Sequence, residues 1–304
     1  MTIAFGACLK NASAGPILND IVAKTPELML WLGDNVYADT TDPAKLRAAY
    51  GKLQANPNFK KLLAACRNEA IWDDHDYGVN NGGGDYTGKA AAREEFFKMW
   101  NVPAGTPRWD AQGVYQSFVS GPVGKRVQVI MLDVRYNKSP WSAGTSTSAT
   151  MLGAQQWEWL ATQLEQPAEV RIIASGVQVL TSGQGSTTES WAKMPNEQKK
   201  LFQLVKDKNA KGVIYISGDQ HWGEVSVIPG AHGYDAVELT AAGLDRTESD
   251  LLTNTYRVGQ VANGSAKFGL VSIDWVADPV ITIRVIYPGG TAALEYVRKL
   301  STLA

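Results

Sequence analysis

The sequence has few cysteines and no excess of charge of one sign. Its 304 residues include 2 cysteines, Cys8 and Cys66, which are too few for a disulfide framework and leave open only a single bridge. Lysine plus arginine number 29 and aspartate plus glutamate number 30, so the net charge is −1. A chain without a basic excess cannot neutralise many backbone phosphates, and this composition argues against a dedicated nucleic-acid binder.

Long apolar runs and a leader sequence are also missing. No run approaches the roughly 20 apolar residues that span a bilayer. The chain opens directly on a predicted strand, without the basic and apolar segments of a leader. We therefore expect either a cytosolic protein or one whose leader has been removed. With 44% hydrophobic and 19% charged residues, the bulk of the chain is expected to fold.

Short apolar runs alternate with helical patterns over the first two thirds of the chain, which predicts an α/β layering. The predicted strands there are the opening segment, 28–32, 127–132, 170–174 and 213–216, and the predicted helices are 42–52, 87–100, 154–164 and 196–205. The last third favours strands at 235–240, 269–275 and 280–287. No linker rich in Pro, Gly or Ser divides the chain. We therefore predict one domain over residues 1–304, with two sheets packed face to face and helices outside them.

Acidic residues follow several of the predicted strands. The loops concerned are 33–37 (Gly-Asp-Asn-Val-Tyr), 72–76 (Trp-Asp-Asp-His-Asp) and 217–221 (Ser-Gly-Asp-Gln-His). Open α/β sheets place their sites beyond the carboxyl ends of the strands, so these loops are expected to converge on one crevice. Any single aspartate could merely cap a turn. Together, however, clustered carboxylates repel one another unless a cation lies between them, and the loops predict a metal site.

Histidine is scarce, which makes its placement informative. The chain has 3 histidines. His75 and His221 lie in the acidic loops, where Asp, His, Tyr and Cys side chains are all metal ligands by type. His232 lies in a Pro-Gly-Ala-His-Gly loop and is interpreted as structural.

An ordered set of motifs carries a family resemblance. In chain order the motifs are 5–8 (Phe-Gly-Ala-Cys), 33–37, 72–76 followed by two asparagines at 80–81, 132–135 (Leu-Asp-Val-Arg), 156–160 (Gln-Trp-Glu-Trp-Leu), 175–178 (Ser-Gly-Val-Gln) and 217–221. The set resembles the alkaline phosphatase D (PhoD-like) family of metallophosphatases over residues 5–244. The resemblance implies an α/β (α+β) fold of the metallophosphatase type, a two-sheet β sandwich flanked by helices in four αββα layers. Because Cys8 lies near the start, the N-terminal β domain of larger members is expected to be absent.

The resemblance also implies a set of metal ligands, since the family's metal centre is similar to that of purple acid phosphatases. The implied ligands are Cys8, Asp34, Tyr37, Asp74, Asp219 and His221. Asp34 would bridge two metals, Tyr37 would bind ferric iron as a phenolate, and Cys8 and His221 would complete the iron shell. The remaining aspartates would hold a hard cation. The expected cofactors are therefore one Fe³⁺ and one or two Ca²⁺, with other divalent cations left open.

The activity implied by the resemblance is that of a metal-dependent phosphoesterase of the alkaline phosphatase or phosphodiesterase type. Metal-activated water or hydroxide would attack a small-molecule phosphate ester. His75 would protonate the leaving group, while Asn80 and Asn81 would donate to the phosphoryl oxygens. Arg135 would either contact the phosphate or form an ion pair with Asp133 beneath the site.

Two aromatic side chains are candidates to line a substrate cleft. They are Trp222, which follows a predicted metal ligand, and Trp141, which lies in a loop rich in Ser and Thr. A glycine-rich segment at 83–89 (Gly-Gly-Asp-Tyr-Thr-Gly-Lys) looks like a phosphate-binding P-loop. Ala90, however, replaces the Ser or Thr that would hold magnesium, so the P-loop interpretation is rejected.

Two other functions stay open from the sequence. One is a phospholipase-like phosphodiesterase on the same scaffold, and the other is a non-catalytic binding protein stabilised by calcium. The resemblance implies no protein partner. Because members of the family are usually exported, it implies a periplasmic or secreted location.

Overall fold

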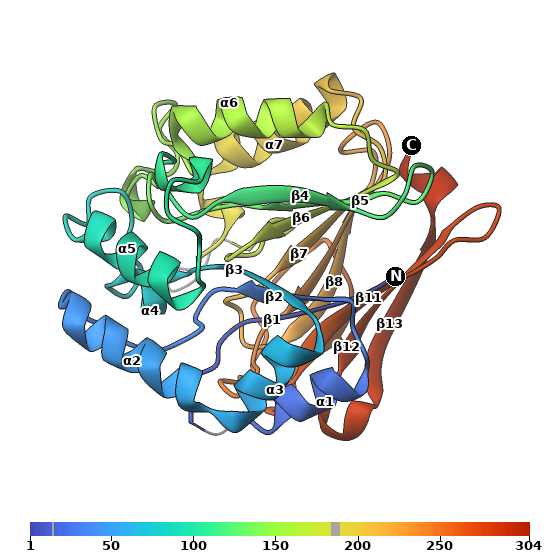
Figure 1. Ribbon diagram of the computed structural model, residues 1–304. Coiled ribbons are helices and arrows are strands. Elements are labelled where there is room, and N and C mark those ends of the chain that lie inside the picture. The colour runs from blue at the N-terminus through green and yellow to red at the C-terminus, as the bar shows by residue number, and fades with distance from the viewer. Residues whose placement is uncertain (14, 184–188) are drawn as a thin grey trace.

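Two β-sheets form the centre of the protein (Figure 1), whose computed structural model describes residues 1–13, 15–183 and 189–304. The first sheet contains β1 (Thr2–Gly6), β2 (Leu28–Leu32), β3 (Arg67–Ile71), β11 (Phe268–Asp274), β12 (Val280–Ile286) and β13 (Ala292–Lys299). The second contains β4 (Gln116–Ser120), β5 (Val127–Met131), β6 (Val170–Ser175), β7 (Val213–Ser217), β8 (Gly223–Ile228), β9 (Ala236–Ala241) and β10 (Arg257–Val261). Among the described residues, the strand orders are β13-β12-β11-β1-β2-β3 and β10-β8-β9-β7-β6-β5-β4.

Each sheet contains a block of parallel strands. In the first sheet β1, β2 and β3 run parallel, and in the second β5, β6, β7 and β9 do. Parallel strands are covered on both faces and read as continuous apolar runs. Accordingly, β2 and β7 are buried at every position. Because parallel strands end at one edge of a sheet, the loops that follow them are brought to the same end of the protein.

Helices cover the outer faces of the two sheets (Figure 1). They are α1 (Ile17–Ala23), α2 (Pro43–Ala55), α3 (Pro57–Ala65), α4 (Asp74–Tyr77), α5 (Lys89–Met99), α6 (Gly153–Leu164) and α7 (Pro195–Asp207). Helices α6 and α7 lie over the second sheet, and α1, α2 and α3 lie beyond the first. Side chains alternate along each strand, so Val129 of β5 packs between the sheets and Ile130 packs under α6 and α7. The layers confirm the predicted α/β class with two helix-flanked sheets.

The predicted elements end within a few residues of the observed ones, and most of the strands that the sequence does not predict lie at the edges of the sheets. Strands β4, β10 and β13 are each an edge of a sheet. An edge strand is covered on fewer sides, so its sequence need not be a continuous apolar run; β13, for example, has no fully buried residue. The buried strand β8 is also not predicted, because Glu224 and Ser226 interrupt its apolar run.

The two cysteines are both free, so the single disulfide left open by the sequence does not form. Cys8 is buried in the loop after β1, and Cys66 is half-buried directly after α3. Across the described ranges, every helix is too short or too polar to cross a bilayer.

Candidate metal centre

The loops after β1, β2 and β7 bring ligand-type side chains together. Cys8, Asp34 and His221 each place one ligand atom within 4.8 Å of the other two. Tyr37 joins this group, because its hydroxyl donates to Asp34 Oδ2 at 3.1 Å and lies 3.3 Å from His221 Nε2. These four residues come from three loops that are far apart in the sequence, and they are the ones that the resemblance assigned to iron.

A second group shares Asp34 with the first. Asp34, Asp74 and His75 also place one ligand atom each within 4.8 Å of one another. Asp74 is the first residue of α4, and the main-chain N–H of His75 donates to Asp34 Oδ1 at 3.4 Å. Asp34 therefore lies between two ligand groups, which is the position of a bridging carboxylate.

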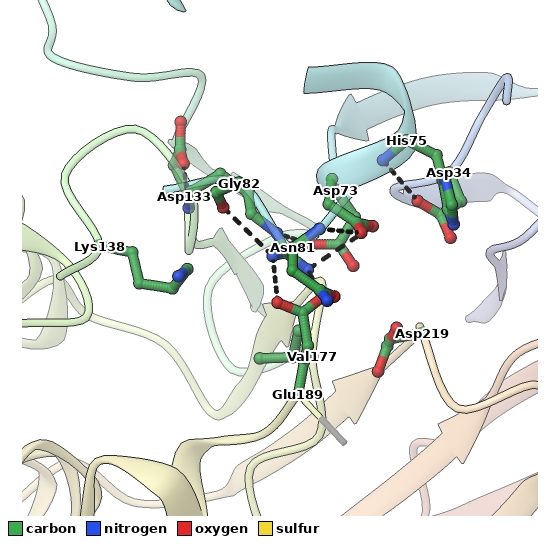
Figure 2. A network of polar contacts seen from close by, with 12 residues as sticks. Asp34, Asp73, His75, Asn81, Gly82, Asp133, Lys138, Val177, Glu189 and Asp219 are labelled. Carbon is green, nitrogen blue, oxygen red and sulfur yellow. Dashed lines mark hydrogen bonds and ion pairs between the residues drawn. The ribbon is translucent and has the colours of Figure 1, made fainter. Parts of the chain in front are cut away.

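A third group contains Asp219, which was expected beside Asp74. Asp219, Asp73 and Glu189 each place one carboxylate oxygen within 4.8 Å of the other two. Figure 2 shows Asp34, Asp73, Glu189 and Asp219 gathered around one region, from loops that follow different strands. The acidic cluster is thus larger than the sequence predicts.

Arg135 lies beneath this cluster and is fully buried. Its Nε donates to Asp73 at 2.5 Å, and its two terminal nitrogens donate to Glu189 at 2.6 Å each. A further contact reaches the carbonyl of Gly82 at 3.4 Å. Of the two roles left open by the sequence, the structure favours the ion pair. The partners differ from the expected one, because Asp133 accepts main-chain N–H groups of its own loop, including that of Arg135 at 2.8 Å.

The buried carboxylates are electrostatically unfavourable without a cation. Burial and the neighbouring Asp74 raise the pKa of Asp34 well above its usual range, and burial and Asp73 do the same for Asp219. Asp74 Oδ1 is buried and has no hydrogen-bond partner among the described residues. This oxygen lies 3.7 Å from a terminal nitrogen of Arg135, which is an ion-pair distance but too long for a hydrogen bond. A multivalent cation would offset the repulsion among the carboxylates and coordinate this oxygen, so the acidic residues fit a metal.

The side chains of His221 and Cys8 fit a metal for a different reason. Burial lowers the pKa of His221 to about 4, which keeps the imidazole neutral with a lone pair for a metal. Burial and the charge of Asp34 raise the pKa of the Cys8 thiol. A strongly Lewis-acidic ion is therefore needed to displace the thiol proton, since thiolate is the ligand form.

Left-handed backbone is concentrated at these ligands. The φ angles are 63° at Cys8, 51° at Asp34, 60° at Asp219 and 61° at His221. Such conformations cost a non-glycine residue roughly 1–2 kcal/mol and persist where the surrounding structure enforces them, often at functional sites. Here they let short loops after β1, β2 and β7 turn their ligand side chains toward one another.

A cavity of about 630 Å³ opens beside the ligand groups. Among the residues expected to contact substrate, His75, Asn80, Asn81 and Trp222 line it. Trp141 instead lines a neighbouring cavity. The predicted cleft residues are therefore divided between two adjoining hollows.

Known proteins resemble this chain in sequence. The sequence matches the family described as PhoD-like phosphatase over residues 3–258. The chain belongs to the PhoD-like phosphatase family. It is similar to alkaline phosphatase D of Bacillus subtilis (strain 168), with 22% identity over 274 residues, and the match covers 73% of this chain but 46% of that protein. The chain thus spans about half the length of this curated relative.

Solved structures give the same fold. The structure of PhoD matches with a TM-score of 0.78 and 16% identity, covering 100% of this chain and 72% of the other. A dimetal phosphatase from Danio rerio matches with a TM-score of 0.61 and 12% identity, covering 99% of each chain. At these identities the likeness concerns the fold, which is the two-sheet, helix-flanked fold of the metallophosphatases.

Several residues of this PhoD-like site are not predicted from the sequence. Asp73 is part of the acidic loop at 72–76, so a signal for it was present. Asp39 accepts from His75 Nδ1 at 2.6 Å, Glu189 joins the acidic cluster, and Arg246 lines the cavity. Nothing in the pattern around these last three marks them, because their loops reach the site only through tertiary packing.

Asp76 organises the PhoD-like centre without belonging to a ligand group. Its carboxylate accepts the main-chain N–H groups of Asp34 at 3.2 Å, Asn35 at 3.1 Å and Asp73 at 2.7 Å. These bonds join the loops that follow β2 and β3. Asp76 therefore fixes the positions of the carboxylates on both loops.

Proposed function

We propose that the chain is a metal-dependent phosphoesterase of the alkaline phosphatase or phosphodiesterase type. The observation that carries the proposal is the position of Asp34, a carboxylate shared by two ligand groups beside a cavity lined by Asp74 and His221. Two cations that share a carboxylate are the arrangement used to hydrolyse phosphate esters. Membership of the PhoD-like phosphatase family supports the same activity.

The proposal assigns Fe³⁺ to Cys8, Asp34, Tyr37 and His221. Burial and the adjacent thiol raise the pKa of Tyr37 far above its usual range, so a strongly Lewis-acidic ion is required to obtain the phenolate. The carboxylates of the second and third groups suit Ca²⁺, which prefers oxygen ligands. When bound, the metal ions would supply Lewis acidity and lower the pKa of coordinated water. Elemental analysis of the purified protein tests whether both metals are present and in what number.

Protein side chains provide the remaining chemistry. His75 is proposed to protonate the leaving oxygen, because Nδ1 is engaged by Asp39 and the other ring nitrogen is left for proton transfer. Asn80 and Asn81 are proposed to bind the phosphoryl oxygens, and Trp222 forms a wall of the cavity. The proposal also includes a location outside the cytoplasm, in keeping with the export usual in the family.

Asp34→Asn tests the proposed activity. With metal-loaded protein we expect hydrolysis of 4-nitrophenyl phosphate that is abolished by a chelator and falls at least about 100-fold in the variant, because the carboxylate shared by the two ligand groups is lost and metal binding is weakened. Release of 4-nitrophenol is the measurement. Asp42→Asn is the matched control, since Asp42 is an exposed aspartate that caps α2 and asparagine also caps helices.

Two results would contradict the proposal. Turnover that survives the chelator would exclude a metal mechanism. A metal-loaded protein without turnover, in which Asp34→Asn changes only the melting temperature, would indicate a calcium-stabilised binding protein. Comparing 4-nitrophenyl phosphate with bis(4-nitrophenyl) phosphate separates a monoesterase from a phospholipase-like diesterase.

A further inference from the structure

Lys138 is a buried cation that has no carboxylate partner among the described residues. Its side chain is 1% exposed. The ammonium donates to the carbonyl of Ser139 at 3.3 Å and lies 4.1 Å from the centroid of the Trp141 ring. An ammonium has three N–H donors, and a buried charge is costly unless it is paired. The charge of Lys138 is therefore available to an anionic ligand.

The carboxylates nearest to this charge are already engaged or exposed. Glu189 binds Arg135 through both of its oxygens and also accepts the indole N–H of Trp141. Asp85 is exposed, where water screens its charge. Figure 2 shows the Lys138 side chain pointing toward Asn81 and Glu189. Lys138 is thus a buried positive charge without an ion-pair partner among the described residues, and Asp85 is an exposed carboxylate on the lining of the same cavity.

A second cavity, of about 290 Å³, adjoins Lys138 and Trp141. Asn80 and Asn81 line both this cavity and the larger one beside the metal-ligand groups. The two cavities therefore adjoin and share these asparagines in their linings. A ligand with a phosphoryl group in the larger cavity could extend across them into the smaller one.

The glycine-rich segment rejected as a P-loop shapes this second cavity. The main-chain N–H of Gly84 donates to the carbonyl of Lys138 at 2.8 Å. A Cβ atom on Gly83 would lie 2.8 Å from the same carbonyl and 3.0 Å from Lys138 Nζ. Glycine at 83 therefore leaves the ammonium its space. Burial and the neighbouring Arg135 lower the pKa of Lys138 to about 8, which is consistent with an unpaired cation.

We propose that the smaller cavity is a leaving-group subsite, which selects phosphate esters whose alcohol carries a second anionic group, a phosphate or a carboxylate. The inference rests on the proposed phosphoesterase function. The ester would span Asn80 and Asn81, with the second anion paired to Lys138. Hydrolysis transfers the phosphoryl group from the alcohol oxygen to water, and the alcohol leaves with one proton.

Three esters of equal chain length test the subsite. They are 3-hydroxypropyl phosphate, propane-1,3-diyl bisphosphate and 3-(phosphonooxy)propanoate, whose far ends carry a hydroxyl, a phosphate and a carboxylate. With the metal-loaded wild type we expect kcat/KM for at least one anionic ester to exceed that for the hydroxyl ester by about tenfold or more, as a charge-assisted pair would give. The two anionic esters distinguish a second phosphate from a carboxylate.

Lys138→Met and Lys138→Arg attribute the preference to this side chain. In Lys138→Met the ratio of anionic to neutral kcat/KM is expected to fall toward one, whereas Lys138→Arg keeps the charge and most of the ratio. Lys200→Met is the matched control, because Lys200 also lies over a tryptophan ring, 4.2 Å from the centroid of Trp157, but half-exposed on α7. Its ratio is expected to equal that of the wild type.

The outcomes separate this inference from the proposed function. If the metal-loaded protein hydrolyses neither the three esters nor any other phosphate ester, the proposed function fails. If all three are hydrolysed at equal kcat/KM, the subsite is excluded and the phosphoesterase stands. This wild-type comparison needs no variant, so it decides even if Lys138→Met does not fold. A folded Lys138→Met that keeps the full preference also overturns the inference.

Discussion

The imidazole of His75 is held from two sides. Its Nδ1 lies 2.6 Å from Asp39 Oδ1, and its ring stacks on Tyr37 with the centroids 4.0 Å apart. A carboxylate that accepts from Nδ1–H fixes the tautomer and the orientation of the ring. At the scale of single residues, the contact with Asp39 therefore orients His75 toward a site whose other side chains come from different loops.

His75→Asn is expected to show a loss that depends on the leaving group. A proton donor matters most when the leaving alkoxide is a strong base, so kcat should fall about 10²- to 10⁴-fold on an alkyl phosphate and far less on 4-nitrophenyl phosphate. In Asp39→Asn, kcat on the alkyl ester should fall about 10-fold or more, because Asp39 orients the His75 ring without donating the proton. Phosphate release from both esters is the measurement. Equal losses on the two esters would show that His75 is not the proton donor.

At the scale of elements, the side chain of Gln156 joins helix α6 to the loop that follows strand β5. Gln156 Nε2 donates to the carbonyl of Asp133 at 2.7 Å, and its Oε1 accepts the main-chain N–H of the same residue at 2.8 Å. On the same helix, Trp157 donates to Glu197 of α7 at 2.8 Å. The motif at 156–160 therefore serves packing, and it holds the loop that carries Arg135.

Gln156→Leu is expected to destabilise the fold. The substitution leaves the buried N–H and C=O of Asp133 unpaired, at about 1–3 kcal/mol for each group. The free energy of unfolding in urea is the measurement. Gln163→Leu, on the same helix but less buried, should stay within about 0.5 kcal/mol of the wild type. If the two variants are equally stable, Gln156 does not hold the loop.

At the scale of the whole molecule, both sheets deliver negative charge to one place. Asp34 and Asp73 follow strands of the first sheet, and Asp219 follows a strand of the second. Burial raises the pKa of Asp73 to about 8 despite its ion pair with Arg135. In the metal-free fold these carboxyls hold protons that the unfolded chain has already lost, so rising pH favours unfolding.

The metal-free protein is therefore expected to lose stability as pH rises from about 6.5 to 8.5, by roughly 2–5 °C in melting temperature. His221 and His232 act in the opposite sense at the lower end of this window, because burial lowers the pKa of each to about 4 while the unfolded chain releases these protons only near its usual pKa of about 6.5. Their contribution is complete above about pH 7.5, and the carboxyls outweigh it. The metal-loaded protein should change less, since bound cations replace the protons. Thermal melts of chelator-treated and metal-loaded samples measure the difference.

Asp34→Asn gives an independent check of the same repulsion. Removing one negative charge should make the metal-free variant more stable than the metal-free wild type at pH 8.5, while it loses metal-induced stabilisation. Asp110→Asn, an exposed control, should behave as the wild type. A metal-free wild type whose melting temperature rises over this range would contradict the account.

The fold could be predicted where burial is complete. Strands such as Leu28–Leu32 and Val213–Ser217 are covered on both faces, so their apolar runs identify them. Edge strands such as β13 carry no comparable signal, because pairing with a neighbour rather than full burial holds them in place. The pattern of apolar residues indicates burial, so it predicts a strand poorly where the strand is only partly buried.

By itself the sequence determined the types of ligand and their attachment to strand ends, because short loops keep such residues beside the strands that precede them. The positions of Asp34 and His221 follow from that local constraint, whereas Cys8 was singled out only by the family resemblance. Only the tertiary structure decided which charges meet. Arg135 pairs with Glu189, 54 residues away, whereas Lys138 has no carboxylate partner in the part of the chain that the structure describes, because distances between such residues depend on how the two sheets pack rather than on spacing along the chain.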